Sequence, residues 1–366
     1  GLDPEPVVSL DPLGLLTPVV LYALVFALHL VLPGSWVRGY VTGQDGEPLR
    51  YRLNGLPVLA SMVGLWLAAG WSGLVPWDWL YQTRWEGLTA ACAMGLLFTL
   101  VLVLPAPSTG RALPVDLFLG RLENPQLWGG RVDAKMFLYL VGAVMLELNV
   151  LGFTAHHWIV TEGSPSPGVL LCAAMLTWFV VDYLTFEVVH LWTYDFFAER
   201  TGFKLGWGCL TFYPYFYAIG LWAVAPLPDP GTPTALLVAY ALVFWAGWSL
   251  ARGANMQKWF FKTAPHRAFL GIAPRVVTDG QRTLLVSGFW GVSRHVNYLG
   301  EVLMATGIAL AVGYPLSPWP WLYPLYYVLL LGTRERDDHA RCEAKYGALW
   351  QEYTDKVPYR IIPFVY

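Results

Sequence analysis

Long apolar runs, separated by short polar segments, dominate the chain. A helix that crosses a bilayer needs about 20 mostly apolar residues, because lipid offers its backbone groups no hydrogen-bond partner. The runs therefore predict an all-α fold, a polytopic membrane helical bundle of about ten transmembrane helices. The predicted spans are 13–32, 57–75, 88–105, 136–156, 168–191, 205–225, 235–250, 298–312 and 318–331.

Composition supports the membrane interpretation. Hydrophobic residues make up 56% of 366 positions and charged residues 13%, whereas soluble domains carry about 25% charged residues. A soluble helical protein could not bury so many continuous apolar runs. We expect a single membrane domain over residues 1–366, with N-terminal helices at about 13–191 and a C-terminal part at about 192–366. The first run lacks a basic flank and a small-residue cleavage site, which favours a helix over a signal peptide.

Charge and cysteine content exclude several classes of partner. The net charge of −2 predicts no nucleic-acid partner. The four cysteines show no CxxC or pairing pattern, so neither a disulfide nor a thiolate metal site is expected. The chain also has no G-x-G-x-x-G segment after a strand and no Walker motif, so no standard fingerprint identifies a dinucleotide.

Basic residues cluster on both sides of the last two apolar runs. The segment 251–297 is strongly basic, with Asp279 as its acid, and the segment 334–360 is rich in both charges. Because the two runs form a hairpin, both segments should lie on one side, which the positive-inside rule makes cytoplasmic together with the C-terminus. A cationic concavity there suits an anionic cofactor that meets a lipophilic substrate. Alternatively, these cations only set the topology or contact anionic membrane lipid, and charge alone does not decide between the two interpretations.

Ionisable residues inside predicted spans are costly and therefore functional candidates. Glu147 and Asn149 lie in the fourth run. Proton donation in an apolar pocket is one suitable chemistry, because burial raises the pKa of a carboxyl group; hydrogen bonding between helices is the structural alternative. Metal binding would need further histidine motifs beside Glu187-x-x-His190, so no metal is predicted. The proton-donor candidates are Glu187, Asp182, Tyr213 and Tyr217, the last two beside the helix-kinking Pro214.

Three C-terminal motifs are distinctive. They are RGANMQK at 252–258, LLVSGFWGVSRHVNYLGE at 284–301, and the run from Arg334 that ends in VPYRIIP at 357–363. Together they resemble the sterol reductase family, which comprises the C14-, C7- and C24(28)-sterol reductases and the lamin B receptor. Weaker matches, such as Leu53-Asn54-Gly55, extend the resemblance over nearly the whole chain.

The resemblance implies a membrane enzyme that reduces a sterol double bond with NADPH, with its cofactor and substrate part at about 192–366. Arg294 and His295 lie within the second motif and are expected to hold phosphate or ribose, and Lys262 stands where an arginine often contacts the cofactor. Positions that contact NADPH in the family match Lys258, Leu285, Trp290, Asn297, Tyr298, Asp338, Cys342, Tyr346 and Tyr353 here.

The resemblance leaves the reduced bond open. Val296 replaces the proline of many relatives, which is closer to the C7 reductases, yet a C14-sterol reductase is our preferred prediction and a C7-sterol reductase the alternative. An S-adenosylmethionine-dependent isoprenylcysteine methyltransferase and a non-enzymatic sterol-binding scaffold are alternatives from other classes. We expect the endoplasmic reticulum if the source is eukaryotic, and the cytoplasmic or intracytoplasmic membrane if it is bacterial. The sequence predicts no oligomeric state.

Overall fold

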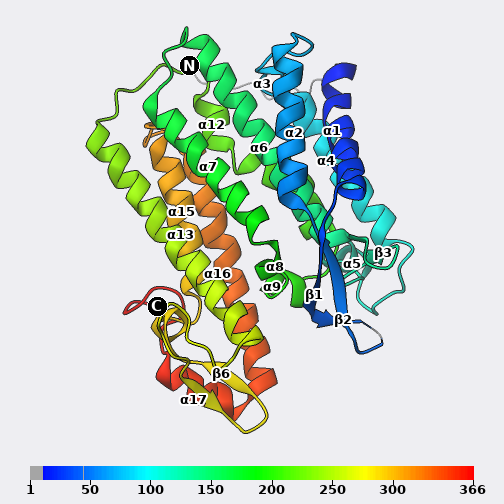
Figure 1. The fold of residues 1–366 in the computed structure, drawn as a ribbon, viewed down its shortest axis with the longest axis vertical. Coiled ribbons are helices and arrows are strands. Elements are labelled where there is room, and N and C mark those ends of the chain that lie inside the picture. The colour runs from blue at the N-terminus through cyan, green and yellow to red at the C-terminus, as the bar shows by residue number, and fades with distance from the viewer. Residues whose placement is uncertain (1–10, 44) are drawn as a thin grey trace. The chain divides into compact units, whose positions relative to one another are not determined.

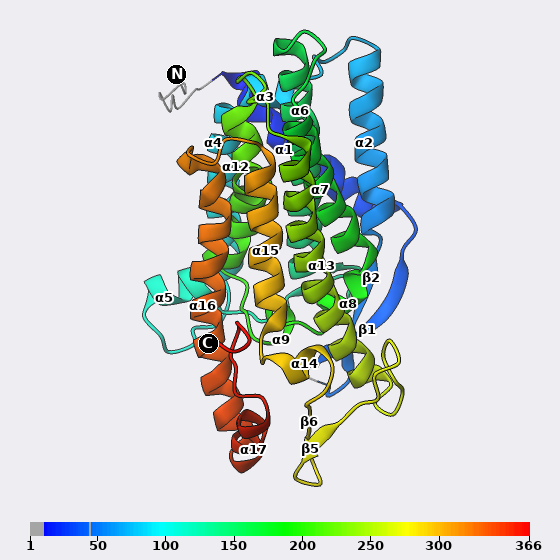
Figure 2. The same ribbon diagram turned by 90° about the vertical axis from the view of Figure 1, so that its left-hand side faces the viewer.

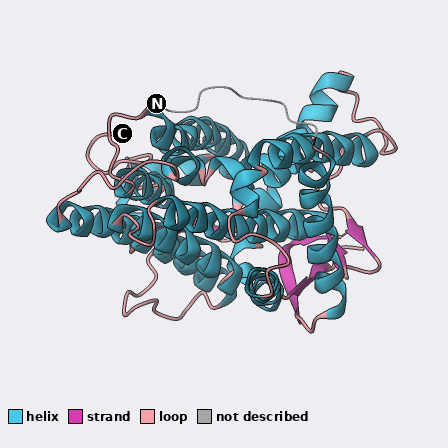
Figure 3. Ribbon diagram, turned by 90° about the horizontal axis from the view of Figure 1, so that it is seen from above, coloured by secondary structure: helices cyan, strands magenta, loops and turns pink. Residues whose placement is uncertain are grey.

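The computed structural model describes residues 11–43 and 45–366, most of them helical (Figures 1 to 3). The chain divides into two compact units, which meet in sequence between Gly231 and Thr232. Within the described residues, five helices are long and apolar enough to cross a membrane, and α2 (Gly55–Trp71) and α15 (Val296–Ala311) are shorter apolar helices. The helical membrane fold is thus confirmed, whereas the number of ten spans stays a prediction. The five long helices are α1 (Pro12–Val31), α4 (Arg84–Val103), α6 (Ala134–Val160), α7 (Pro167–Thr185) and α13 (Thr234–Thr263).

Helix α6 is the centre of the first unit. Helices α1, α2 and α7 and the short α3 (Trp79–Gln82) pack against it, and its middle, from Leu138 to Val150, is almost entirely buried. Close packing depends on small residues: a Cβ atom on Gly142 would lie 2.6 Å from the Tyr213 ring. An apolar helix that is buried all round is what a central position requires.

The predicted span 205–225 is not one helix. It divides into α10 (Phe203–Trp207), a π-helix η1 (Gly208–Phe212), α11 (Tyr213–Phe216) and α12 (Ile219–Val224). Pro214 has no N–H group, so the carbonyl of Leu210 loses its helical donor. The Tyr22 hydroxyl donates to that carbonyl instead, and Asn149 Nδ2 donates to the Pro214 carbonyl over 2.9 Å. Side chains from α1 and α6 thus satisfy the broken backbone.

The predicted span 168–191 also ends early. Helix α7 stops at Thr185, and Phe186 has non-helical dihedral angles (φ −107°, ψ 32°). Two four-residue helices follow, α8 (Glu187–His190) and α9 (Tyr194–Phe197). Glu187 and His190 therefore lie beyond the end of the span and not inside it.

Three short antiparallel hairpins occur among the described residues, and the all-α prediction omitted them. Strands β1 (Ser35–Thr42) and β2 (Pro48–Leu53) join α1 to α2, and the buried Tyr51 of β2 packs with Met136, Leu191 and Phe196. The other hairpins pair β3 (Gln126–Leu127) with β4 (Val132–Asp133), and β5 (Val276–Thr278) with β6 (Thr283–Leu285).

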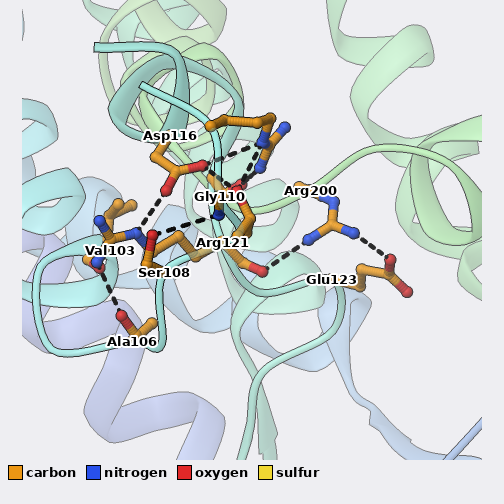
Figure 4. A network of polar contacts seen from close by, with 11 residues as sticks. Val103, Ala106, Ser108, Gly110, Asp116, Arg121, Glu123 and Arg200 are labelled. Atoms are coloured by element: carbon orange, nitrogen blue, oxygen red, sulfur yellow. Dashed lines mark hydrogen bonds and ion pairs between the residues drawn. The ribbon is translucent and has the colours of Figure 1, made fainter. Parts of the chain in front are cut away.

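A polar network fixes the chain after α4, around α5 (Leu113–Leu119) (Figure 4). The buried Asp116 carboxylate pairs with Arg111 at 3.0 Å and Arg121 at 2.8 Å. A hydrogen bond from Thr109, together with Arg121, lowers the pKa of Asp116 to about 2. Arg121 also donates to the Val103 carbonyl over 3.2 Å. An arginine at the last carbonyls of a helix caps that terminus.

The second unit is built on α13, α15 and α16 (Pro318–Tyr346). Helices α13 and α15 approach closely through glycines, since a Cβ atom on Gly247 would lie 2.6 Å from the Gly300 carbonyl oxygen. Small residues allow such contact between membrane helices. The backbone N–H groups of Arg294 and His295 donate to the carbonyls of Tyr359 and Arg360. The two charged segments predicted on either side of the last apolar runs therefore lie together.

Candidate functional site

Two of the C-terminal motifs bind each other in the second unit. Gln257 of α13 donates to the Ser287 carbonyl over 3.2 Å and accepts from the Phe289 N–H group over 2.9 Å. Between these contacts Gly288 has a φ of 63°, and a Cβ atom there would lie 2.2 Å from Gln257 Nε2. Only glycine fits a left-handed backbone this close to another side chain. Gln257, which the sequence analysis did not select, thus holds the loop that leads into α14 (Phe289–Val292).

Trp290 and Lys258 form one side of the site. The Trp290 indole N–H donates to the Ala254 carbonyl over 2.8 Å, which fixes the ring. Lys258, one turn further along α13, places its Nζ atom 5.5 Å from the Trp290 ring centroid, within cation–π range. Lys262 follows one turn later, near the end of α13. A fixed aromatic plane therefore lies beside a short row of cations.

Asn297 at the start of α15 has an unused acceptor. Its Nδ2 group donates to Asn255 Oδ1 over 3.3 Å. Its buried Oδ1 atom has no hydrogen-bond partner among the described residues. Buried polar atoms are normally satisfied, so this atom can accept a hydrogen bond from a ligand.

His295, Tyr298 and Asp338 form the other side of the site. The His295 and Tyr298 rings stack with centroids 4.7 Å apart, and His295 Nε2 lies 3.8 Å from Asp338 Oδ2. Burial, with the charges of Lys258 and Arg294, lowers the pKa of His295 to about 3, so this imidazole is neutral and the contact is no ion pair. Burial raises the pKa of Asp338, and the Lys258 charge opposes that effect.

The remaining predicted cofactor residues belong largely to a hydrophobic cluster around α17 (Ala348–Lys356). Tyr353 stacks on Trp350 with centroids 5.0 Å apart, and burial raises the pKa of Tyr353. Leu285 is buried in β6, and Cys342 and Tyr346 pack against the cluster. Burial raises the pKa of Cys342 to about 12, so it is a neutral thiol, with its sulfur 4.0 Å from Asp338 Oδ2.

Arg294 is buried and joins two segments of the second unit. Its Nη2 group donates to the Pro358 carbonyl over 2.9 Å, and Nη1 lies 3.4 Å from His339 Nδ1. Its Nε atom has no hydrogen-bond partner in the described part of the chain. The structure therefore gives Arg294 a packing role, and one N–H group remains for a ligand.

Glu187, in the first unit, is held against the start of α2. Its Oε2 atom accepts from the Gly55 N–H group over 3.0 Å, and a Cβ atom on Gly55 would lie 2.7 Å from Oε1. This contact explains why glycine stands at position 55 of the Leu53-Asn54-Gly55 motif, because only glycine leaves room for the Glu187 carboxyl group. Burial raises the pKa of Glu187 to about 7, and the Gly55 hydrogen bond opposes the rise.

The tyrosine candidates form a row of rings in the same unit. Tyr217 and Tyr213 have centroids 4.8 Å apart, Tyr213 and Tyr183 6.4 Å, and Tyr183 stacks on His190 at 3.9 Å. Tyr183 also interacts electrostatically with Tyr213 and Glu187. Tyr183 therefore connects two of the proton-donor candidates, Tyr213 and Glu187. The sequence did not single it out, because nothing distinguishes one tyrosine inside an apolar run.

Two carboxyl groups occupy helices α6 and α7. Asp182 is nearly buried on α7, next to Tyr183. Glu147 is buried at mid-length of α6; its Oε1 atom accepts from the Thr177 hydroxyl over 2.9 Å, and its Oε2 atom has no partner within the described residues. Those same residues contain no group of three or more His, Cys, Asp or Glu side chains that could hold a metal ion.

Comparison with known proteins gives one consistent result. The model of the Ergosterol biosynthesis ERG4/ERG24 family matches residues 15–366. Delta(14)-sterol reductase of Arabidopsis thaliana is 35% identical, over 97% of this chain and 98% of that protein. Delta(14)-sterol reductase TM7SF2 of Mus musculus is 36% identical, over 97% and 86%. Delta(14)-sterol reductase of Methylotuvimicrobium alcaliphilum is 32% identical, over 93% and 80%. A match over almost the full length shows that the chain belongs to the ERG4/ERG24 sterol reductase family.

Proposed function

We propose that the protein reduces the C14 double bond of a sterol with NADPH. The observation that supports it most is the similarity over nearly the whole chain to relatives named Delta(14)-sterol reductase. The earlier C7 alternative rested on Val296 alone. The full-length similarity favours C14.

The second unit fits a phosphorylated nicotinamide dinucleotide. NADPH, when bound, supplies a hydride to carbon. Lys258 and Lys262 can bind phosphate through charge-assisted hydrogen bonds, Asp338 can accept from ribose hydroxyls, and the unsatisfied Oδ1 atom of Asn297 can accept from a ligand donor. The fixed Trp290 ring provides a face for a flat heterocycle.

The reduction also needs a proton at the second alkene carbon. We propose Glu187 as its source, with Asp182, Tyr213 and Tyr217 as the other candidates. A carboxyl group whose pKa is about 7 is partly protonated at neutral pH, and such matching favours general acid catalysis. Glu187 would lose its proton to carbon, become a carboxylate that accepts from Gly55, and regain a proton from water.

We propose the following membrane placement. The basic segments of the second unit and the C-terminus face the cytoplasm. The membrane is the endoplasmic reticulum in a eukaryotic source, or the cytoplasmic or intracytoplasmic membrane in a bacterial one. Membrane lipid surrounds the apolar helices, whose many exposed large hydrophobic side chains would otherwise contact water.

A sterol panel tests the proposal. The purified protein is incubated with NADPH and sterols unsaturated at C14, C7 or C24, and the products are analysed by mass spectrometry. We expect a gain of two hydrogen atoms in the C14-unsaturated sterol alone, with one NADPH oxidised per sterol. Reduction of the C7 sterol alone would identify a C7 reductase, and no reduced product would favour a binding scaffold. Thermal stabilisation by S-adenosylmethionine and not by NADPH would identify a methyltransferase.

A further inference from the structure

The β1–β2 hairpin is fixed at the end of a membrane-spanning helix. Helix α1 ends at Val31, β1 begins at Ser35, and β2 ends two residues before α2 (Figure 1). Arg52 of β2 donates to the carbonyls of His29 (2.8 Å), Leu30 (3.2 Å) and Leu32, and Arg131 donates to the Leu30 carbonyl over 2.9 Å. Since these are the last carbonyls of a span, the base of the hairpin lies at the level of the lipid headgroups.

The outward face of this base is cationic. The strand register places Trp36 opposite Arg52 and Arg38 opposite Arg50, so all four side chains share one face. Trp36 is 45% exposed, and the Arg50 guanidinium lies 5.2 Å from its ring centroid. Arg38 and Arg50 are exposed, and among the described residues neither forms an ion pair. Like charges directly opposite each other destabilise a hairpin, so this face is suited to an anion.

A second exposed tryptophan lies in a neighbouring turn, in which a Cβ atom on Gly130 would lie 2.7 Å from the Arg50 carbonyl oxygen. Trp128, in the turn between β3 and β4, is 64% exposed and has a φ of 53°. Its ring centroid is 6.3 Å from that of Phe26, inside the α1 span. A bulky residue rarely adopts this left-handed conformation. Tryptophans gather where membrane meets water, so Trp128 marks the interface beside the cationic face.

Charge along the hairpin is also separated. Asp45 and Glu47 lie at its tip, where Gly43 N–H donates to the Glu47 carbonyl. Arg52 lies at the base, and the Arg38–Arg50 pair lies midway along the ribbon, closer to α1 and α2 than the acids are. Anionic headgroups would attract the base and repel the tip, whereas an acidic soluble partner would have no reason to select the end next to the membrane.

We propose that the ribbon face, defined as Trp36, Arg38 and Arg50 with the adjacent Trp128, binds the headgroup of an anionic phospholipid. Arginine suits phosphate because its planar guanidinium donates two parallel hydrogen bonds, and the tryptophans provide an amphipathic border. The inference rests on the proposed membrane placement of the chain and is independent of which sterol bond is reduced.

Native mass spectrometry tests the ribbon face. The full-length protein is purified in detergent and mixed with equal amounts of phosphatidylserine and phosphatidylcholine, and the adducts of each lipid are counted. One arginine near an anionic surface contributes roughly fivefold. We therefore expect the wild-type preference for phosphatidylserine to fall about fivefold in Arg38→Gln or Arg50→Gln and about thirtyfold in the double variant. Arg38→Lys with Arg50→Lys should keep most of it. Lys356→Gln is the control, because Glu352 already neutralises Lys356.

Several outcomes would overturn the proposal. They are a double variant that retains the wild-type preference, a wild type that binds both lipids equally, or phosphatidylserine adducts that an acidic peptide displaces. Thermal unfolding shows whether the double variant folds. If it does not fold, the lipid preference of the two single variants decides the test. Sterol reduction and NADPH binding are measured on the same samples. Lost lipid preference with intact reduction supports the ribbon face, and lost reduction with intact lipid preference contradicts only the proposed function.

Discussion

Replacement of Glu187 by glutamine should raise stability and slow turnover at the same time. Burial raises the pKa of Glu187 from 4.5 to about 7, which corresponds to about 3 kcal/mol at 1.36 kcal/mol per pH unit. Between these two values the folded protein keeps a proton that the unfolded chain has released. The free energy of unfolding of the wild type therefore falls as pH rises through this window. Glutamine cannot ionise and still accepts from Gly55, so Glu187→Gln avoids the loss.

Thermal unfolding from pH 5 to pH 8 measures this difference. The stability gain of Glu187→Gln over the wild type should be larger at pH 8 than at pH 5, by up to about 3 kcal/mol. Glu352→Gln is the matched control, because that carboxylate is half exposed and pairs with Lys356. Turnover of Glu187→Gln should fall by about a hundredfold or more, as expected for loss of a general acid, while NADPH affinity is unchanged.

Two results would refute the reasoning. If the wild type and Glu187→Gln lose stability in parallel as pH rises, the Glu187 carboxyl group does not hold a proton in the folded protein. If the variant keeps full turnover, Glu187 is not the proton donor and the other acids of the first unit take precedence. The wild-type rate should itself fall above about pH 7, because the donor must be protonated.

Three further substitutions test the second unit and the packing of the first. Lys258→Ala should weaken NADPH binding roughly tenfold to a hundredfold, measured by calorimetry, because a charged hydrogen bond contributes about 1.5–3 kcal/mol; a dissociation constant no higher than that of Lys356→Gln would contradict the assignment. Gly288→Ala should destabilise the fold by about 1–3 kcal/mol, and by less in a Gln257→Ala background, since the new methyl group meets that side chain; equal costs in both backgrounds would show that the contact is not responsible. Lys135→Met should lower the melting temperature without changing NADPH affinity, because the buried ammonium donates to three backbone carbonyls; an unchanged melting temperature would refute that role.

Hydropathy predicted where the long helices lie and missed where they break. The runs 13–32 and 88–105 correspond to α1 and α4 within a few residues, because a span is defined by the sum of many apolar side chains. The break at 205–225 depends on one missing N–H group at Pro214 and on Tyr22, a distant residue that satisfies the freed carbonyl. A local window cannot include that partner. The β1–β2 hairpin gave no alternating signal in the sequence, because the apolar residues of Trp36-Val37-Arg38-Gly39-Tyr40-Val41 stand in adjacent pairs.

The site was predicted from motifs more than from physical patterns. Lys258, Trp290 and Asp338 were named because they match a family, and the structure brings Lys258 near both of the others. Glu187 was selected as a charge inside a span, and it lies instead just beyond the end of one. Tyr183 was not selected, because its importance lies in contacts with three other elements that only the folded chain brings together.

The three C-terminal motifs are mutually dependent in the folded protein. Gln257 of the first motif holds the backbone of the second at Phe289, and Arg294 of the second donates to the carbonyl of Pro358 in the third. A substitution that loosens any one of these contacts would move Trp290 or Tyr298 without touching a ligand. Motif similarity therefore marks two kinds of residue at once, the proposed cofactor-binding residues and the residues that hold these in place. The structure distinguishes two situations among them: the Oδ1 atom of Asn297 has no hydrogen-bond partner among the described residues, whereas Tyr353 is buried in a hydrophobic cluster.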